Sequence, residues 1–325
     1  MPQRVKTMLV VLMVALACAI ATLILHFREP EYGGKRLSFW VRDYEIMVHS
    51  PAADEAVRNI GTNGLPMLLS MLEAKDHPAW SNVVRFANQH GLKHLKYTDA
   101  LTHHLRAIYA FNVLGANASN AVPKLLKMYR RNPCFEPWAG AALGQIGPAA
   151  SAAVPVFLVN LGNTNRGVRE VAASALGGIH CCAASVVPAL TTALDDPACS
   201  VRSAAMEALG RYGEEAKSAA PALLVYLEKD RYSGQAVWAL TQVHADPQMV
   251  LKVLLKMLHH AEFRNRLLGI VGLQNMGKDA RAAIPDLLQM LDEQDVRPEL
   301  IEALKAIDPA AAAKAGVNEQ PSAPL

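Results

Sequence analysis

The sequence predicts an all-α, right-handed solenoid, in which short helices pair into hairpins and the hairpins stack side by side. A proline-led apolar segment recurs with a spacing of 32 or 33 residues, and glycines recur eight and eleven residues before several of these prolines. Hydrophobic residues make up 52% of the chain but aromatic residues only 6%, which favours an aliphatic, alanine-rich core. A helical period of this length is the signature of stacked repeats.

Each repeated segment places apolar residues two, three and six positions after its proline, on one face of a helix. Proline is tolerated in the first turn of a helix, so we expect a helix to begin at each of these prolines. They are Pro66, Pro123, Pro155, Pro188, Pro221 and Pro285. One further unit lacks the proline, and Val253–Leu258 fits it with Lys252 in the proline position.

A first helix precedes each proline-led helix and is expected to end at glycine, which readily adopts the left-handed conformation of a helix cap. The Leu-Gly steps are Leu143-Gly144, Leu176-Gly177 and Leu209-Gly210, and a second set of glycines stands at Gly115, Gly147, Gly213 and Gly277. The repeats span residues 50–307, with an insertion at 77–98 that breaks the period. Residues 308–325 form an Ala/Pro-rich tail that we expect to be partly disordered.

The repeated unit resembles HEAT repeats, including the type found in HEAT-like bilin lyases. The residues that carry the resemblance are Val168-Arg169, Ala175-Leu176-Gly177 and Val187-Pro188-Ala189-Leu190, with their counterparts one period later. The resemblance implies an armadillo-like helical solenoid. Together with the lead-in Glu29–Trp40, the chain is similar to bacterial membrane-anchored HEAT-repeat proteins that have no assigned activity.

The N-terminus predicts a membrane anchor. Met8–Leu25 contains no charged residue and is long enough to cross a bilayer as a helix, while Arg4 and Lys6 precede it. We expect residues 1–7 to be cytoplasmic, 8–27 to form one transmembrane helix and 28–49 to be a juxtamembrane lead-in. This places the solenoid on the periplasmic side of a bacterial inner membrane.

Two other interpretations of the N-terminus remain open: a cleaved signal peptide and a lipoprotein signal at Cys18. The residues before Cys18 match a lipobox poorly, since Leu16 lies one position late. The apolar run also continues past Cys18, so cleavage would leave an apolar stump. We therefore favour the uncleaved anchor.

Catalytic motifs are absent from the sequence, and we predict no catalytic residue, cofactor or metal. Cys134, Cys181, Cys182 and Cys199 are interpreted as free thiols; a bond between the adjacent pair is conceivable but strained, and His180 with that pair lacks the second cluster of a metal site. His90 and His94 stand four residues apart, but no acid falls at ligand spacing, so we interpret them as solvated.

Four arginines recur at one phase of the repeat, just inside or before the first helices. They are Arg169, Arg202, Arg266 and Arg297. Such a row could bind an anion. We favour a structural role, in which each arginine braces neighbouring repeats against loop acids such as Asp195 and Asp196.

We expect the proline-led helices to line the concave side of the solenoid and to display a partner-binding groove. Its outward row is Lys124, Lys127, Val156, Val159, Ala189, Thr192, Ala222, Val225, Lys256, Asp286 and Gln289. The row changes from basic through apolar to acidic, which suits an apolar peptide or helix with a fixed direction. Alternatively, a tight superhelix closes the groove and buries these small residues.

The sequence therefore favours a membrane-tethered protein–protein interaction scaffold with a protein or peptide partner. A net charge of only +3 over 325 residues does not indicate nucleic-acid binding. The alternative is an enzyme or enzyme subunit similar to the HEAT-like bilin lyases, which only the resemblance of the units supports.

Overall fold

The computed structural model describes residues 29–46, 50–76, 98–134, 136–228 and 233–314. The predicted anchor and almost all of the predicted insertion lie outside these ranges. The chain divides into two compact units, residues 1–121 and 122–325, which are described separately. Apart from one two-stranded hairpin, the regular structure in the described ranges is helical, as the sequence predicts.

Unit 1 begins with a β-hairpin and continues with helices. Its elements are β1 (Glu31–Tyr32), β2 (Lys35–Arg36), α2 (Leu37–Val41), η1 (Arg42–Ile46), α3 (Pro51–Ile60), η2 (Gly61–Gly64), α4 (Leu65–Leu72), α6 (Ala100–Leu114) and η3 (Gly115–Ala121). The two strands pair antiparallel, with Glu31 opposite Arg36. Ser38 lies inside α2, where its hydroxyl donates a hydrogen bond of 2.5 Å to the Glu29 carboxylate.

Unit 2 consists of α7 followed by helical hairpins in chain order. The first helices of these hairpins are α8 (Pro137–Ile146), α10 (Arg166–Ile179), α12 (Cys199–Tyr212), α14 (Gly234–Gln242), α16 (Phe263–Met276) and α18 (Arg297–Ile307). The second helices are α9 (Val154–Asn160), α11 (Ala183–Ala193), α13 (Ala220–Glu228), α15 (Pro247–Leu258), α17 (Ile284–Gln289) and α19 (Pro309–Lys314), and α7 (Val122–Arg131) lies in their layer. The predicted tail thus begins with the helix α19.

Short 3-10 helices lead into three of the second helices, and one follows α17. They are η4 (Gly147–Ala153), η5 (Gly213–Ala219), η6 (Gly277–Ala283) and η7 (Met290–Asp292). One helical run, Pro137–Asn160, has the length and hydropathy of a membrane span among the described residues. It comprises α8, η4 and α9, and α8 packs against α7 and α10, so it belongs to the stacked hairpins.

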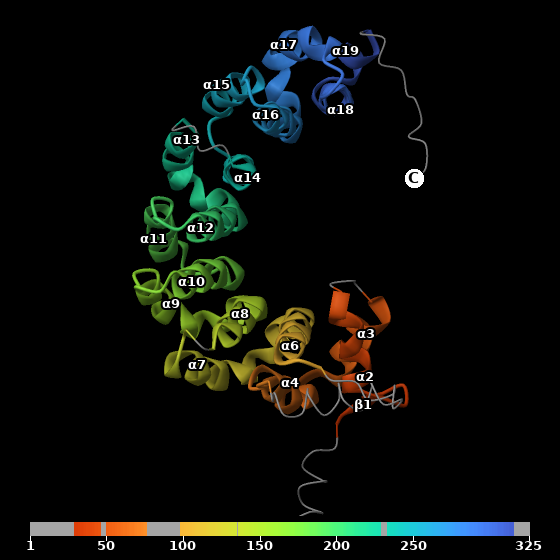
Figure 1. The fold of residues 1–325 in the computed structure, drawn as a ribbon, viewed down its shortest axis with the longest axis vertical. Helices are drawn as coiled ribbons and strands as arrows, with labels where there is room; N and C mark the ends of the chain where they lie inside the picture. Colours follow the sequence, from red (N-terminus) through yellow and green to blue (C-terminus); the bar gives the residue numbers. More distant parts are fainter. Residues whose placement is uncertain (1–28, 47–49, 77–97, 135, 229–232, 315–325) are drawn as a thin grey trace, which may run out of the picture. The chain divides into compact units, whose positions relative to one another are not determined.

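The two helices of each hairpin form two layers of unit 2. Successive first helices pack directly on one another from α8 to α18, and they lie on the inner side of the curve of this unit (Figure 1). The second helices lie on the outer side. The expectation that the proline-led helices line the concave side is therefore wrong, because the first helices approach one another more closely.

Glycines at the interface between first helices explain this close approach. A Cβ atom at Gly144 would lie 3.0 Å from the Cα of Ala175, and one at Gly177 would lie 2.7 Å from the Cα of Ala208. A Cβ at Gly178 would lie 2.5 Å from the carbonyl oxygen of Gly144. The sequence analysis expected the first helices to end at the glycines of the Leu-Gly steps. Gly144 and Gly177 instead lie inside α8 and α10.

The second set of glycines does cap the first helices, as predicted. All four have positive φ, between 50° and 79°. Five of the six prolines stand second in their helices, which confirms their predicted role as helix starts. Proline in this position costs no intrahelical hydrogen bond.

Three hairpins depart from this plan. The hairpin of α18 and α19 has Asp308 at the end of its first helix, and two others carry a histidine where α8, α12 and α16 are followed by the capping glycine. His180 has φ 49° and His244 has φ 50°. In both hairpins the 3-10 segment is missing and the second helix begins earlier. Pro188 consequently lies inside α11, and α15 begins at Pro247 rather than near Lys252.

Two of the four repeated arginines, Arg169 and Arg266, bond to an acid of the next loop, which confirms the structural interpretation for these two. Arg169 donates from Nε and Nη2 to the carboxylate of Asp196, at 2.7 and 2.9 Å, and from Nη1 to the carbonyl of Asn163 at 2.8 Å. Arg202 Nη1 donates to the carbonyl of Asp196 at 2.8 Å. Arg266 repeats the pattern with the carboxylate of Asp295 at 2.9 Å. Each arginine thus ties its own helix to a preceding loop, and two of them also reach the next loop.

A Gly177→Ala substitution tests the contact between the first helices. The added methyl group would overlap the backbone of α12, and overpacking of this kind costs about 1–3 kcal/mol. We expect a lower free energy of unfolding in urea. Gly162→Ala is the matched control, since its Cβ would meet only the carbonyl oxygen of Val159 at 3.7 Å. Equal stability of the two variants would contradict the proposed constraint.

An Asp196→Asn substitution tests the arginine brace through its pH dependence. The hydrogen bond from Arg169 lowers the pKa of Asp196 below its ordinary value. A lowered folded-state pKa stabilises the protein above the unfolded pKa of about 4, and this contribution is lost as the pH falls through the folded value. The thermal midpoint of the variant should therefore lie below that of the wild type near pH 7, and the gap should close in acid. The exposed Asp195→Asn serves as control; a gap independent of pH would contradict the brace.

Candidate binding site on the inner helix layer

The predicted groove residues lie on the outer layer, along successive second helices of unit 2. Val159 and Val225 are the most notable, with 77% and 47% of their surface exposed. Lys124, Lys127, Thr192, Lys256 and Gln289 are also exposed, and Val156, Ala189, Ala222 and Asp286 are partly exposed. The row is not buried by a closed superhelix, but it forms an open surface of the outer layer.

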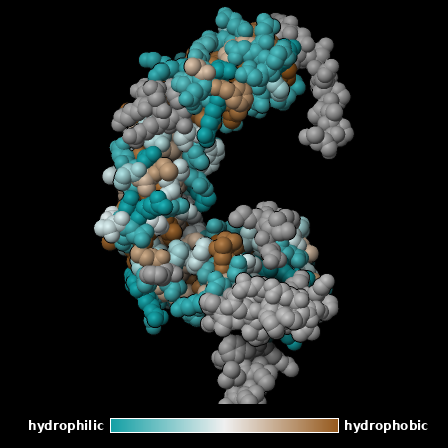
Figure 2. All heavy atoms as spheres, viewed as in Figure 1, coloured by the Kyte–Doolittle hydropathy of each residue, from teal (hydrophilic) through white to brown (hydrophobic). Residues whose placement is uncertain are grey.

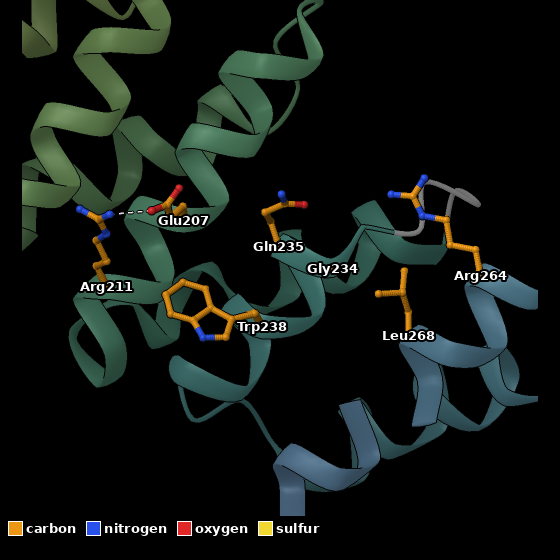
Figure 3. Close-up of a pocket in the computed structure, with 7 residues that line it drawn as sticks. All are labelled: Glu207, Arg211, Gly234, Gln235, Trp238, Arg264 and Leu268. Atoms are coloured by element: carbon orange, nitrogen blue, oxygen red, sulfur yellow. Dashed lines mark hydrogen bonds and ion pairs between the residues drawn. The ribbon is translucent and has the colours of Figure 1, made fainter. Parts of the chain in front are cut away.

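A hollow of about 620 Å³ opens instead on the inner layer, where α12, α14 and α16 meet (Figure 3). Its lining residues are Glu207, Arg211, Gly234, Gln235, Trp238, Arg264 and Leu268. They come from three consecutive first helices, so the stacking of the hairpins itself creates the hollow.

The floor of the hollow is apolar and depends on two glycines. Trp238 is partly exposed, and its ring fits against α12 because a Cβ at Gly210 would lie 2.2 Å from the ring carbon Cζ3. Gly234 similarly leaves room for Leu268, whose Cδ2 would be 3.3 Å from an added Cβ. Small residues at these positions therefore seat two large apolar side chains at the surface.

The rim of the hollow carries charge at both ends. Arg211 and Glu207 form an ion pair of 2.6 Å within α12, on one side of the Trp238 ring (Figure 3). Arg264 lies at the opposite end, beside Leu268. Within the described ranges Arg264 makes no hydrogen bond or ion pair. The hollow thus presents an indole between two guanidinium groups, of which only one is neutralised.

The inner surface extends from the hollow in both directions. Arg211 also borders a smaller hollow of about 90 Å³, whose other lining residues are Ala141, Gly144, Gln145, Val171, Ser174, Ala175 and Gly178. On α16, Phe263, Leu267 and Val271 stand four residues apart on one face, with Phe263 and Val271 exposed. Figure 2 shows hydrophobic surface over this part of unit 2. Small and apolar side chains therefore line this surface on α8, α10, α14 and α16, and the Arg211–Glu207 ion pair of α12 lies between them.

Sequence reasoning missed this site because it compared only the outward positions of the second helices. The corresponding outward position of the first helices lies two residues before Leu176, Leu209, Leu240 and Leu273. It holds Ser174, Glu207, Trp238 and Val271. The sequence does hold a signal for this site, because Trp238 stands where the two preceding repeats have serine and glutamate. Among the described residues that line the hollow there is no cysteine, serine or histidine.

Comparisons with known proteins agree with the stacked-hairpin architecture. Residues 154–241, which include α9 to most of α14, match the family model for HEAT repeats. Residues 154–241 therefore match HEAT repeats, and the chain has a helical solenoid fold. Among curated proteins, none matched the sequence.

Solved structures show the same fold class at low sequence identity. Kap95p, from a complex in which it binds RanGDP, is 14% identical, with a TM-score of 0.50 over 86% of this chain and 49% of that chain. An engineered protein is 19% identical over 86% and 88% of the two chains, with a TM-score of 0.44. The CpcE–CpcF complex of phycocyanin lyase from Nostoc sp. PCC7120 is 23% identical over 70% and 91%, with a TM-score of 0.39.

Proposed function

We propose that this chain is a membrane-tethered protein-interaction scaffold that binds a segment of another protein along the inner layer of unit 2. The observation that carries the proposal is the hollow at Trp238, an apolar floor that the described side chains of the protein leave open. Tryptophan and arginine are enriched among the residues that dominate binding energy at protein interfaces.

The geometry supports a particular kind of bound segment. An apolar side chain would cover Trp238 and Leu268, and a carboxylate beside it would meet Arg264. The strip of small residues on α8 and α10 would accept an extended chain or a helix laid across the hairpins. Kap95p, whose fold is similar, binds another protein, RanGDP, which supports the same use of the fold here.

The tether is proposed from the sequence of residues 8–27. The uncharged run Met8–Leu25, preceded by Arg4 and Lys6, supports a single-pass anchor in a bacterial inner membrane with the solenoid in the periplasm. A tether would hold the solenoid close to its partner and raise the local concentration of both.

The outer row is a second surface that fits the same function. Val159 and Val225 are large exposed apolar residues on α9 and α13, which a partner could cover. Single exposed apolar residues are, however, common on proteins that bind nothing there. We rank the outer row below the inner layer because the 620 Å³ hollow is lined by first helices. For the enzyme alternative, Glu207, the carboxylate among the described residues that line the hollow, is already paired with Arg211.

A Trp238→Ala substitution tests the inner site. Removing an interface anchor typically costs 2 kcal/mol or more, so we expect capture of partners from solubilised membranes to fall by about 30-fold. The measurement is affinity purification with quantitative mass spectrometry. Val159→Asp on the outer row is the matched control and should retain capture. The reverse result, in which only Val159→Asp loses capture, would move the binding surface to the outer layer.

A second experiment tests the tether. A Val14→Arg substitution places a charge near the centre of the predicted anchor, which costs about 2.5–3.5 kcal/mol of insertion free energy. We expect the wild-type chain to stay in the membrane pellet after alkaline extraction and the variant to be released. Recovery of the wild type in the soluble fraction, with a new N-terminus beyond residue 18, would identify a cleaved signal instead.

A further inference from the structure

Two adjacent thiols lie in contact in the turn between α10 and α11. The Sγ atoms of Cys181 and Cys182 are 3.1 Å apart, and both cysteines are free. Cys182 is exposed and Cys181 is partly exposed, so both can be reached from solvent. The other described cysteines, Cys134 and Cys199, are exposed and separate.

The backbone of this turn explains why the two thiols meet. His180 and Cys182 both have left-handed backbone conformations, with φ of 49° and 59°. L-residues with side chains adopt this conformation rarely, and here it occurs twice in three residues. The turn stands where the hairpins that begin with α8, α12 and α16 have a glycine cap and a 3-10 helix.

Tyr212 of α12 holds the turn from the next hairpin. Its hydroxyl donates to the carbonyl oxygen of Cys181 at 2.7 Å and accepts from the Cys181 N–H at 3.1 Å. The His180 ring stacks on the Tyr212 ring, with centroids 4.8 Å apart. Burial and the neighbouring thiol raise the pKa of Cys181 to about 11, so Cys181 is protonated near neutral pH.

We propose that Cys181 and Cys182 form a redox-active dithiol that closes reversibly into a vicinal disulfide by exchange with a small-molecule disulfide. The exposed Cys182 attacks one sulfur of the oxidant and releases one thiol. Cys181 then gives its proton to the departing thiolate, attacks Cys182 Sγ as a thiolate and so releases the second thiol. One Sγ–Sγ bond forms, the oxidant disulfide is reduced to two thiols, and the two cysteine protons end on those thiols.

The adjacency of the two cysteines makes this bond reversible. Consecutive Cα atoms are about 3.8 Å apart, whereas disulfides usually join Cα atoms about 4.4–6.8 Å apart. A vicinal disulfide is therefore strained, and strained, exposed disulfides are easily reduced. The two Sγ atoms are already in contact at 3.1 Å, so the change that the bond requires lies in the backbone of the turn.

Ring closure would act on the binding hollow through Tyr212. The peptide between the two cysteines becomes part of the ring and must rotate, and its carbonyl oxygen is the acceptor of the 2.7 Å bond from Tyr212. Tyr212 follows Arg211, which lines the hollow. The oxidised form thus loses one of the bonds that hold the end of α12, and the Leu176 carbonyl, 3.2 Å from the Tyr212 hydroxyl, stays as an acceptor.

The proposal is tested on the full chain in detergent by treatment with oxidised glutathione, alkylation of the remaining thiols and peptide mass spectrometry. We expect the peptide that contains both cysteines to be two mass units lighter, with neither glutathione nor alkyl group. Cys134 and Cys199 should carry glutathione or alkyl groups instead. A lasting glutathione adduct on Cys182 with an alkylated Cys181, or two alkylated thiols, would overturn the proposal.

A Tyr212→Phe variant tests the link to α12 in glutathione redox buffers. Loss of a hydrogen bond that stabilises only the reduced form should shift the dithiol–disulfide equilibrium toward the disulfide by about 2- to 10-fold. Tyr226→Phe on α13 is the matched control and should leave the equilibrium unchanged. An unchanged equilibrium in Tyr212→Phe, with the helical circular dichroism retained, would refute the coupling to α12.

Discussion

The close approach of the first helices is the constraint on which unit 2 depends. At Gly144 and Gly177 the backbone of one helix rests on the backbone of the next, with no side chain between them. The second helices, which lack this contact, stand farther apart and form the outer layer. Gly210 is the glycine of the third Leu-Gly step, and it leaves room for the indole ring of Trp238. One sequence feature therefore sets both the direction of the curve and the position of the hollow.

The arginine braces add a second connection between hairpins at the loop edge. Arg169 joins the carbonyl of Asn163 to the carboxylate of Asp196, so that two consecutive loops are held by one guanidinium. Backbone contact between first helices fixes their distance, while the braces fix the loops. Since each hairpin contacts mainly its neighbours, stability in such an array is a sum of local terms.

Much of the fold followed from the sequence because local signals determine it. These signals are the prolines at helix starts, the capping glycines and the arginines at the same position of successive repeats. The choice of inner layer did not follow, because periodicity shows which face of a helix is buried but not how near two backbones come. Gly177 was interpreted as a helix end, although it is a packing position. Trp238 was missed for the same reason, and the contact of Cys181 with Cys182 depends on backbone angles that residue types do not encode.

The stacking also has a mechanical consequence. The angle between two consecutive hairpins is set by the few atoms in contact between them. A change in that angle rotates all the hairpins that follow. A shift of a few tenths of an ångström between α10 and α12 is therefore amplified by the lever arm that reaches to α18. A chain built in this way can convert a small chemical event at one turn into a large displacement at its far end.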